Sequence, residues 1–287
     1  MTRWILMVAV LAVVGTPSAA RAGSAPPDAA GQQVTLYELV LRDGSRLYGA
    51  VERDEPNEIV FKTQAGAIVT VKRTEIGTLK QVTGSLAAGG EFMPPDPNAT
   101  RLFFGPTGRS LARGQAYLGV YEFVMPFVQV GVTDRFSIGG GTPLFFGLDD
   151  SSEHPFWITP KLQVLKTSST DVAVGVFQAL NAGGDGGGVA YAVGTSGNAR
   201  GSFTVGGGMA YGNDGGRAGV IMVGAERQVR RNLKMMTESY VWKGGDGIAS
   251  VGVRFFGARL SADLALGVPL GVNEFFVFPL VNFVYVF

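Results

Sequence analysis

The chain ends in NEFFVFPLVNFVYVF, residues 273–287. Val281, Phe283, Tyr285 and Phe287 recur at two-residue spacing, and a β-strand turns every second residue to the same face. A strand with so apolar and aromatic a face needs apolar surroundings on its outer side. The end of the chain therefore predicts a strand in contact with lipid.

The composition excludes several classes of function. The 287 residues are 46% apolar and 16% charged, carry a formal net charge of +1 and include no cysteine. A near-neutral chain gives no reason to expect a nucleic acid partner. The absence of cysteine excludes disulfide frameworks, cysteine-based zinc sites and thiol nucleophiles. No cofactor is expected.

The N-terminal residues 1–22 are expected to be a signal peptide. Arg3 precedes the apolar run Trp4–Val14, which is too short to span a bilayer as a helix, and Ala20-Arg21-Ala22 forms a cleavage site. The alternative is an N-terminal membrane anchor. No later apolar run approaches 20 residues, so any span must be a closed barrel.

Residues 34–82 predict a small β-module of about five short strands, the pattern of an SH3-like or Sm-like barrel. The module resembles the Sm-like modules of secreted bacterial proteins. The matching residues are Asp43-Gly44-Ser45, Gly49, Ile59-Val60-Phe61, Thr63 and Ile76. Residues 83–113 are rich in Gly and Pro and are expected to be a linker.

Residues 114–287 predict an antiparallel up-and-down transmembrane β-barrel of about 12 strands, so the fold class is all-β. Short and longer connections alternate along it, as in barrels with short turns at one end and longer loops at the other. Counts of ten or fourteen strands, and a soluble lipocalin-like barrel, are the alternatives. The expected segments are 115–124, 126–133, 135–145, 156–166, 171–180, 187–195, 200–211, 217–227, 232–243, 247–256, 258–268 and 274–287.

Alternation also assigns the two faces of each strand. The expected outward face includes Val172, Val174 and Val176, and also Val189, Tyr191 and Val193. A polar inner face is typical of a lumen filled by water or by a plug. The charged residues expected to line the lumen are Lys161, Glu226, Lys234, Glu238, Arg254, Arg259 and Asp263.

Residues 96–287 resemble a group of bacterial outer-membrane β-barrel proteins that have no assigned activity. The phrases NATRLFFGPTG, LARGQAYLGVYEF, GVTDRFSIGGG and FWITPK and the aromatic C-terminal strand carry the resemblance. It implies an outer-membrane location, with residues 34–82 in the periplasm. It further implies Phe283, Tyr285 and Phe287 as the signal read by the barrel-assembly machinery, and outer-membrane lipid as the surroundings.

Two functions remain open at this point. The first is a narrow channel for small polar solutes, lined by the inward charges. The second is a structural barrel that anchors residues 34–82 as an interaction module for a periplasmic protein. An enzyme is not expected, because the lone His154 stands on a polar loop and no motif for a nucleophile, a base or a metal ion accompanies it.

Overall fold

The computed structural model describes residues 36–63, 66–82, 84–86, 92–144, 154–181, 186–198, 200–212, 215–242, 244–272 and 276–287. The expected signal peptide, residues 1–22, lies outside the described residues. The described part consists of β-strands and one 3-10 turn, η1 (Arg73–Glu75). The strands form two large sheets and one short pair, β6 (Ser85–Leu86) with β7 (Phe92–Met93). It includes no helix long and apolar enough to cross a membrane.

The first large sheet is five-stranded and antiparallel, with the order β4-β3-β2-β1-β5. Its core is Leu39, Ile59, Phe61 and Val71, which lie on alternate positions of their strands. Gly44, with φ of 89°, forms the tight turn between β1 and β2 that the Asp-Gly pair predicts. The strands are β1 (Tyr37–Leu41), β2 (Arg46–Asp54), β3 (Glu58–Thr63), β4 (Ile68–Lys72) and β5 (Ile76–Gln81).

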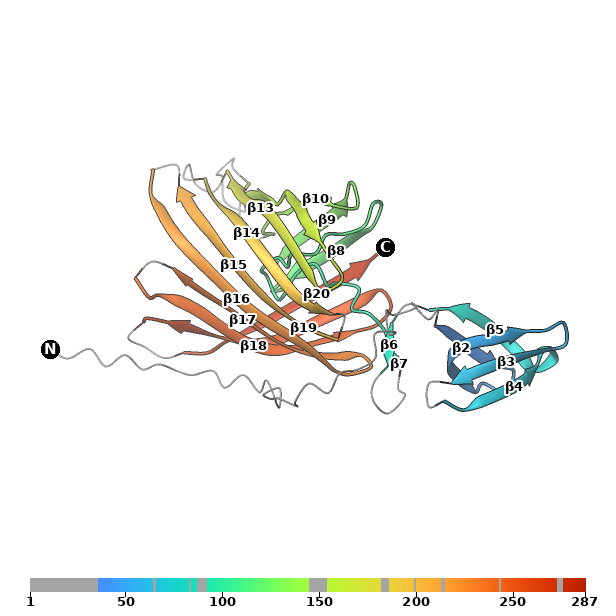
Figure 1. Cartoon of the computed structure of the whole chain (residues 1–287). Helices are drawn as coiled ribbons and strands as arrows, with labels where there is room; N and C mark the ends of the chain where they lie inside the picture. Colours follow the sequence, from blue (N-terminus) through green and yellow to red (C-terminus); the bar gives the residue numbers. More distant parts are fainter. Residues whose placement is uncertain are drawn as a thin grey trace, which may run out of the picture. The chain divides into compact units, whose positions relative to one another are not determined.

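The second large sheet is the barrel (Figure 1). Its first six strands are β8 (Ala116–Tyr121), β9 (Met125–Gly131), β10 (Phe136–Gly141), β11 (Phe156–Ile158), β12 (Lys161–Lys166) and β13 (Thr170–Leu180). The others are β14 (Gly187–Asn198), β15 (Gly201–Gly212), β16 (Arg217–Arg230), β17 (Leu233–Trp242), β18 (Gly247–Phe256), β19 (Leu260–Leu270) and β20 (Phe278–Val286).

The barrel is closed and has twelve strands, which confirms the expected number. Each strand pairs antiparallel with the next, and the last strand, β20, pairs with the first, β8. β11 and β12 count as one strand because both pair with β10 and β13 and only Thr159 and Pro160 separate them. The first hairpin is very tight, since Glu122 and Phe123 adopt φ values of 49° and 62° between β8 and β9.

The two ends of the barrel differ in their connections. At one end, here called the turn end, short turns at 132–135, 167–169, 231–232 and 257–259 join the strands, and the chain ends there at Phe287. The opposite end is here called the loop end. The alternation of short and longer connections that the sequence predicts is thus present among the described residues.

The expected faces are right for most strands and wrong for β14. Val174, Val205, Val251 and Leu264 are 40–55% exposed on the outer face. Val193, however, is buried inside the barrel with Ala173 and Met222, and Tyr191 packs against this cluster. Because Val174 pairs with Ala192 and Ala173 pairs with Val193, the outward residues of β14 are the small ones, Ala190 and Ala192.

The face of β14 can be tested with single cysteines, since the natural chain has none. We expect Ala192→Cys to react readily with an apolar maleimide in detergent micelles, because Ala192 lies on the outer face. Val193→Cys should be protected, because Val193 is 2% exposed. Val205→Cys, outward on β15, is the positive control. Rapid labelling of Val193→Cys together with protection of Ala192→Cys would show that Val193 points outward, as the sequence predicted.

Candidate functional site

Residues 94–113, here called the plug segment, run from β7 to β8 inside the barrel. Their partners are inward side chains of β12, β14 and β16–β20 near the turn end. The second half of the expected linker 83–113 is therefore part of the barrel interior. The buried members other than glycine are Asp96, Asn98, Thr100, Arg101, Leu102, Phe103, Thr107 and Leu111.

The plug segment forms a small hairpin with its tip at residues 102–105. The Thr107 amide donates to the Thr100 carbonyl at 3.0 Å, and the Leu102 amide donates to the Gly105 carbonyl at 2.8 Å. Arg101 and Pro106 form a β-bridge between these two bonds. The hairpin thus satisfies some of its backbone N–H and C=O groups internally, and its remaining buried polar groups need hydrogen-bond partners on the barrel wall.

The carboxylate of Glu238, on β17, holds the tip. It accepts the backbone N–H groups of Phe103 at 2.6 Å and Gly105 at 2.8 Å, and that of Phe104 at 3.1 Å. The Tyr240 hydroxyl donates to the same carboxylate at 2.6 Å. Hydrogen bonds to an ionised acceptor are stronger than neutral ones, so a 1% exposed carboxylate is stabilised here by donors from the plug.

Arg254, on β18, binds the plug backbone from the other side. Its guanidinium donates to the carbonyls of Asn98 at 2.8 Å and Leu102 at 2.7 Å. The same group pairs with Asp96 of the plug at 3.0 Å and with Asp263 of β19 at 2.6 Å. Arg254 is completely buried, so these partners replace its water.

Three more charged wall residues bind the plug segment. Lys161 donates to the carbonyls of Thr100 at 3.0 Å and Arg109 at 2.6 Å. Lys234 lies between Asp96 at 3.0 Å and Glu226 at 2.9 Å. Glu226 also accepts from Arg109 of the plug at 2.8 Å. The plug segment thus supplies a partner to each of these side chains.

The site contains equal numbers of basic and acidic side chains. Its cationic side chains are Arg101, Arg109, Lys161, Lys234 and Arg254, and its carboxylates are Asp96, Asp171, Glu226, Glu238 and Asp263. Removing one partner of a buried pair typically costs about 3–5 kcal/mol, because the other charge stays buried without compensation. The wall and the plug segment are therefore electrostatically matched.

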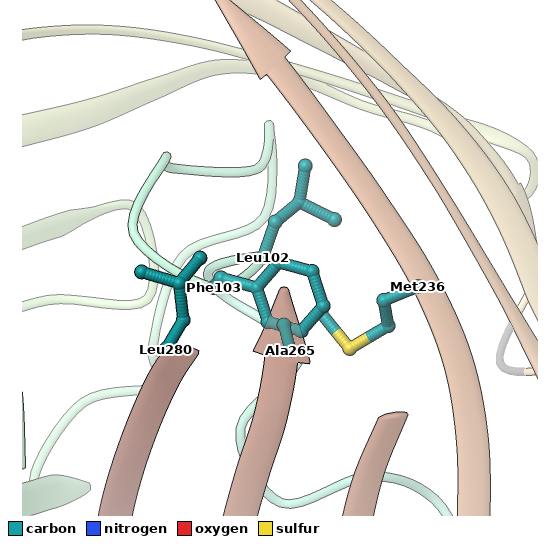
Figure 2. Packing of buried hydrophobic residues seen from close by; sticks show 5 residues of the cluster. All are labelled: Leu102, Phe103, Met236, Ala265 and Leu280. Carbon is teal, nitrogen blue, oxygen red and sulfur yellow. The ribbon is translucent and has the colours of Figure 1, made fainter. Parts of the chain in front are cut away.

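Apolar contacts seat the same tip. Leu102 and Phe103 are fully buried against Met236 of β17, Ala265 of β19 and Leu280 of β20 (Figure 2). A Cβ added at Gly224 of β16 would collide with the Leu102 side chain, so the absence of a side chain on the wall at this position makes room for the plug. The tip is held by packing as well as by charge.

Six of the seven residues expected to line the lumen come together around the plug segment. Lys161, Glu226, Lys234, Glu238, Arg254 and Asp263 are 0–5% exposed. Arg259 does not join them, because β19 begins only at Leu260 and Arg259 lies exposed in the turn before it. The expected position of Arg259 in the lumen is wrong for this reason.

Several residues of the site were not found from the sequence. They are Asp96, Asn98, Arg101 and Arg109 of the plug segment and Asn282 of β20, whose side-chain amide donates to the Phe103 carbonyl at 3.1 Å. A signal was present, because a run with Asp, Arg and three apolar residues at 102–104 is unusual for a solvated linker.

The residues of the expected insertion signal lie on the outer face. Phe283, Tyr285 and Phe287 are 36%, 42% and 66% exposed. The Phe287 amide donates to the Ala116 carbonyl at 2.9 Å, so the last residue closes the ladder against β8. His154 is exposed, and no group of three or more metal-ligating side chains occurs within the described ranges.

Comparison with known proteins finds no match in sequence and only distant similarity in structure. No protein-family model and no curated protein sequence matches the chain. Among solved structures, the KdgM porin in complex with disordered oligogalacturonate is similar with a TM-score of 0.46 and 8% identity, over 60% of this chain and 96% of that one. The NanC porin has a TM-score of 0.41 and 6% identity, over 60% and 97%.

A loop-deletion mutant of OmpT, an outer membrane protein of Vibrio cholerae, has a TM-score of 0.36 and 12% identity, over 88% of this chain and 97% of that one. TM-scores below 0.5 carry no argument about function. The assignment of a closed barrel depends instead on the strand pairing described above.

The stabilisation that Asp96 of the plug segment provides is expected to persist to low pH. Burial raises the pKa of the Asp96 carboxyl, but Arg254 and Lys234 outweigh this effect, so the pKa lies below its ordinary value. A lowered pKa in the folded state gives stability that is present above the unfolded value of about 3.9 and is lost as the pH falls through the folded value. Asp96→Asn should lower the stability of the barrel by about 3 kcal/mol at neutral pH.

The measurement is unfolding in detergent at a series of pH values, with the exposed Asp246→Asn as control. The difference between the parent and Asp96→Asn should stay constant down to about pH 5 and shrink only below about pH 4. A difference that disappears near pH 6 would mean that Asp96 is not held as an anion by its partners.

Proposed function

We propose that the chain is an outer-membrane β-barrel that its own plug segment closes at rest, and that it conducts small polar solutes once the plug is displaced. The observation that carries this proposal is the seating of residues 94–113 among the paired charges of the lumen. An open pore would leave these charges to water, whereas here they are bound to the chain itself.

The outer face supports the membrane location. Large apolar side chains are exposed on every barrel strand except β14, whose outward residues are small, and outward charges lie near strand ends, as with Arg227 and Arg230 of β16. An outward apolar band around a closed antiparallel barrel is typical of outer-membrane proteins. Outer-membrane lipid and the barrel-assembly machinery are the partners that we propose.

The wall charges support the solute class. With the plug displaced, the turn end would present wall side chains of both signs, the cationic Lys161, Lys234 and Arg254 and the carboxylates Glu226 and Glu238. A narrow passage lined by both signs of charge favours small polar solutes over apolar ones.

We also propose that the five-stranded sheet is an Sm-like module in the periplasm. Its support is the Asp43-Gly44-Ser45 turn, in which the Ser45 amide donates to the Asp43 carboxylate at 2.8 Å, and the Ile59-Val60-Phe61 core strand. No observation on the described residues favours the alternative function, a barrel that anchors this module for a periplasmic protein, so we do not propose it.

Single-channel recording in planar bilayers tests the closed state. The parent should be silent, and Gly105→Leu should show conducting steps. A Cβ at Gly105 would collide with the Met222 sulfur and the Tyr240 hydroxyl and would lie 3.2 Å from Glu238, and the larger leucine side chain is expected to push the tip out of its seat. Ala112→Leu places the same side chain at an exposed plug position and should stay silent. Steady conductance in the parent, or silence in folded Gly105→Leu, would contradict the proposal.

The insertion signal has its own test. Phe287→Ser removes an outward ring that is 66% exposed, and we expect it to lower the assembled fraction in a membrane-insertion assay while more protein remains unfolded. Phe203→Ser, a change of another outward aromatic that is 52% exposed, is the matched control. Equal assembly of Phe287→Ser and the parent would show that the terminal ring carries no targeting information.

A further inference from the structure

The loop-end half of the lumen contains a cavity whose lining includes none of the charged residues of the channel proposal. It has a volume of about 400 Å³ and lies between the plug tip and strands β8, β9, β11 and β13–β17. Phe104, Gly105 and Pro106 of the plug contribute to its lining. Its volume falls within the range of about 300–1,000 Å³ that is usual for small-molecule sites.

The lining is aromatic and apolar. Trp157 and Phe177 stack with their ring centroids 6.4 Å apart, and Phe104 contacts Tyr121 at 5.0 Å between centroids. The other apolar lining residues include Val189, Val220 and Met222. Flat aromatic walls favour a ligand that itself has rings, because offset and edge-on contacts between rings add to the free energy of burial.

The lining holds no charged side chain among its described residues. The carboxylate of Glu238, which contacts the lining residues Gly105 and Tyr240, is already bound by three plug amides and by the Tyr240 hydroxyl. A charged group brought into the cavity would lose its hydration without gaining a counterion. The polar groups at the wall are hydroxyls, on Thr159 and on Tyr121, Tyr191 and Tyr240.

We propose that this cavity is a binding site for a small, uncharged, ring-containing molecule. The site is distinct from the charged lumen of the channel proposal, because it exists with the plug seated and the plug tip forms part of its wall. The site is therefore available in the closed state. A negative result in the binding test would contradict this site but would leave the outcome of the conductance test unaffected.

The test uses two fluorescent probes on the folded full chain in detergent. N-phenyl-1-naphthylamine is uncharged, and anilinonaphthalene sulfonate adds an anionic sulfonate to the same aromatic skeleton. We expect saturable binding of the uncharged probe beyond its partition into empty micelles. The anionic probe should bind at least about tenfold more weakly, since the cavity supplies no cation.

Two variants fill the cavity from different strands. Val220→Phe on β16 and Val189→Phe on β14 each add a ring to its lining and should weaken binding of the uncharged probe by at least about tenfold. Val223→Phe makes the same change on the outer face of β16, where Val223 is 39% exposed, and should bind as the parent does. Folding of each variant is checked by its heat-dependent migration in a denaturing gel.

Three outcomes would overturn the proposal. They are no saturable signal from the parent, equal affinity for the two probes, and unchanged affinity in a folded filling variant. If one filling variant does not fold, the other decides. If neither folds, the comparison of the two probes on the parent decides alone.

Discussion

The interior of this barrel depends on one electrostatic constraint: ionised side chains inside a narrow lumen must each have a partner. Arg254 and Lys234 are 0% and 1% exposed, and each has one carboxylate partner on the wall, Asp263 and Glu226 respectively. Asp96 of the plug segment bridges the two cations, and plug carbonyls accept further guanidinium N–H groups. Because an unpaired buried charge costs several kcal/mol, the wall charges and the plug segment stabilise each other. A buried ion pair is by itself weak evidence for stability, but here it specifies where the segment lies.

Shape acts together with charge at the tip. Leu102 fits over Gly224, and Gly105 passes close to Met222 and Tyr240, so small residues stand on both partners where they approach closely. Glu238 then binds three consecutive amides of the tip, an arrangement that a segment shifted by one residue could not reproduce. The match of backbone, side-chain volume and charge indicates a defined resting position for the plug segment rather than loose filling of the lumen.

Alternation along the chain was sufficient to predict the twelve strands, the outward face of most of them and six of the inward charges. It failed where a strand is apolar on both faces: the run Val189–Val193 gives no sign of its direction, and only its register with β13 places Ala192 outside. It also failed at Arg259. The alternation places this residue on the inward face, but Arg259 comes before the first residue of β19 and lies in the turn. The plug segment was missed for a different reason, although the apolar residues at 102–104 were a signal. Its Gly and Pro content is typical of loops, and its partners are distant in sequence, as with Asp96 and Arg254, 158 residues apart.

The lumen is divided between two chemistries that meet at Glu238 and Tyr240. On the turn side, Glu238 holds the plug tip. On the loop side, Tyr240 and Phe104 belong to the wall of the aromatic cavity. The Tyr240 hydroxyl, 2.6 Å from the Glu238 carboxylate, therefore connects the cavity to the group that seats the plug. If a molecule in the cavity binds the plugged and the unplugged barrel with different affinity, reciprocity requires that it shifts the position of the plug by the same free energy. A ligand that also contacts Phe104 favours the seated plug, since that ring leaves the cavity wall when the tip withdraws, so occupancy of the cavity and closure of the lumen would support each other.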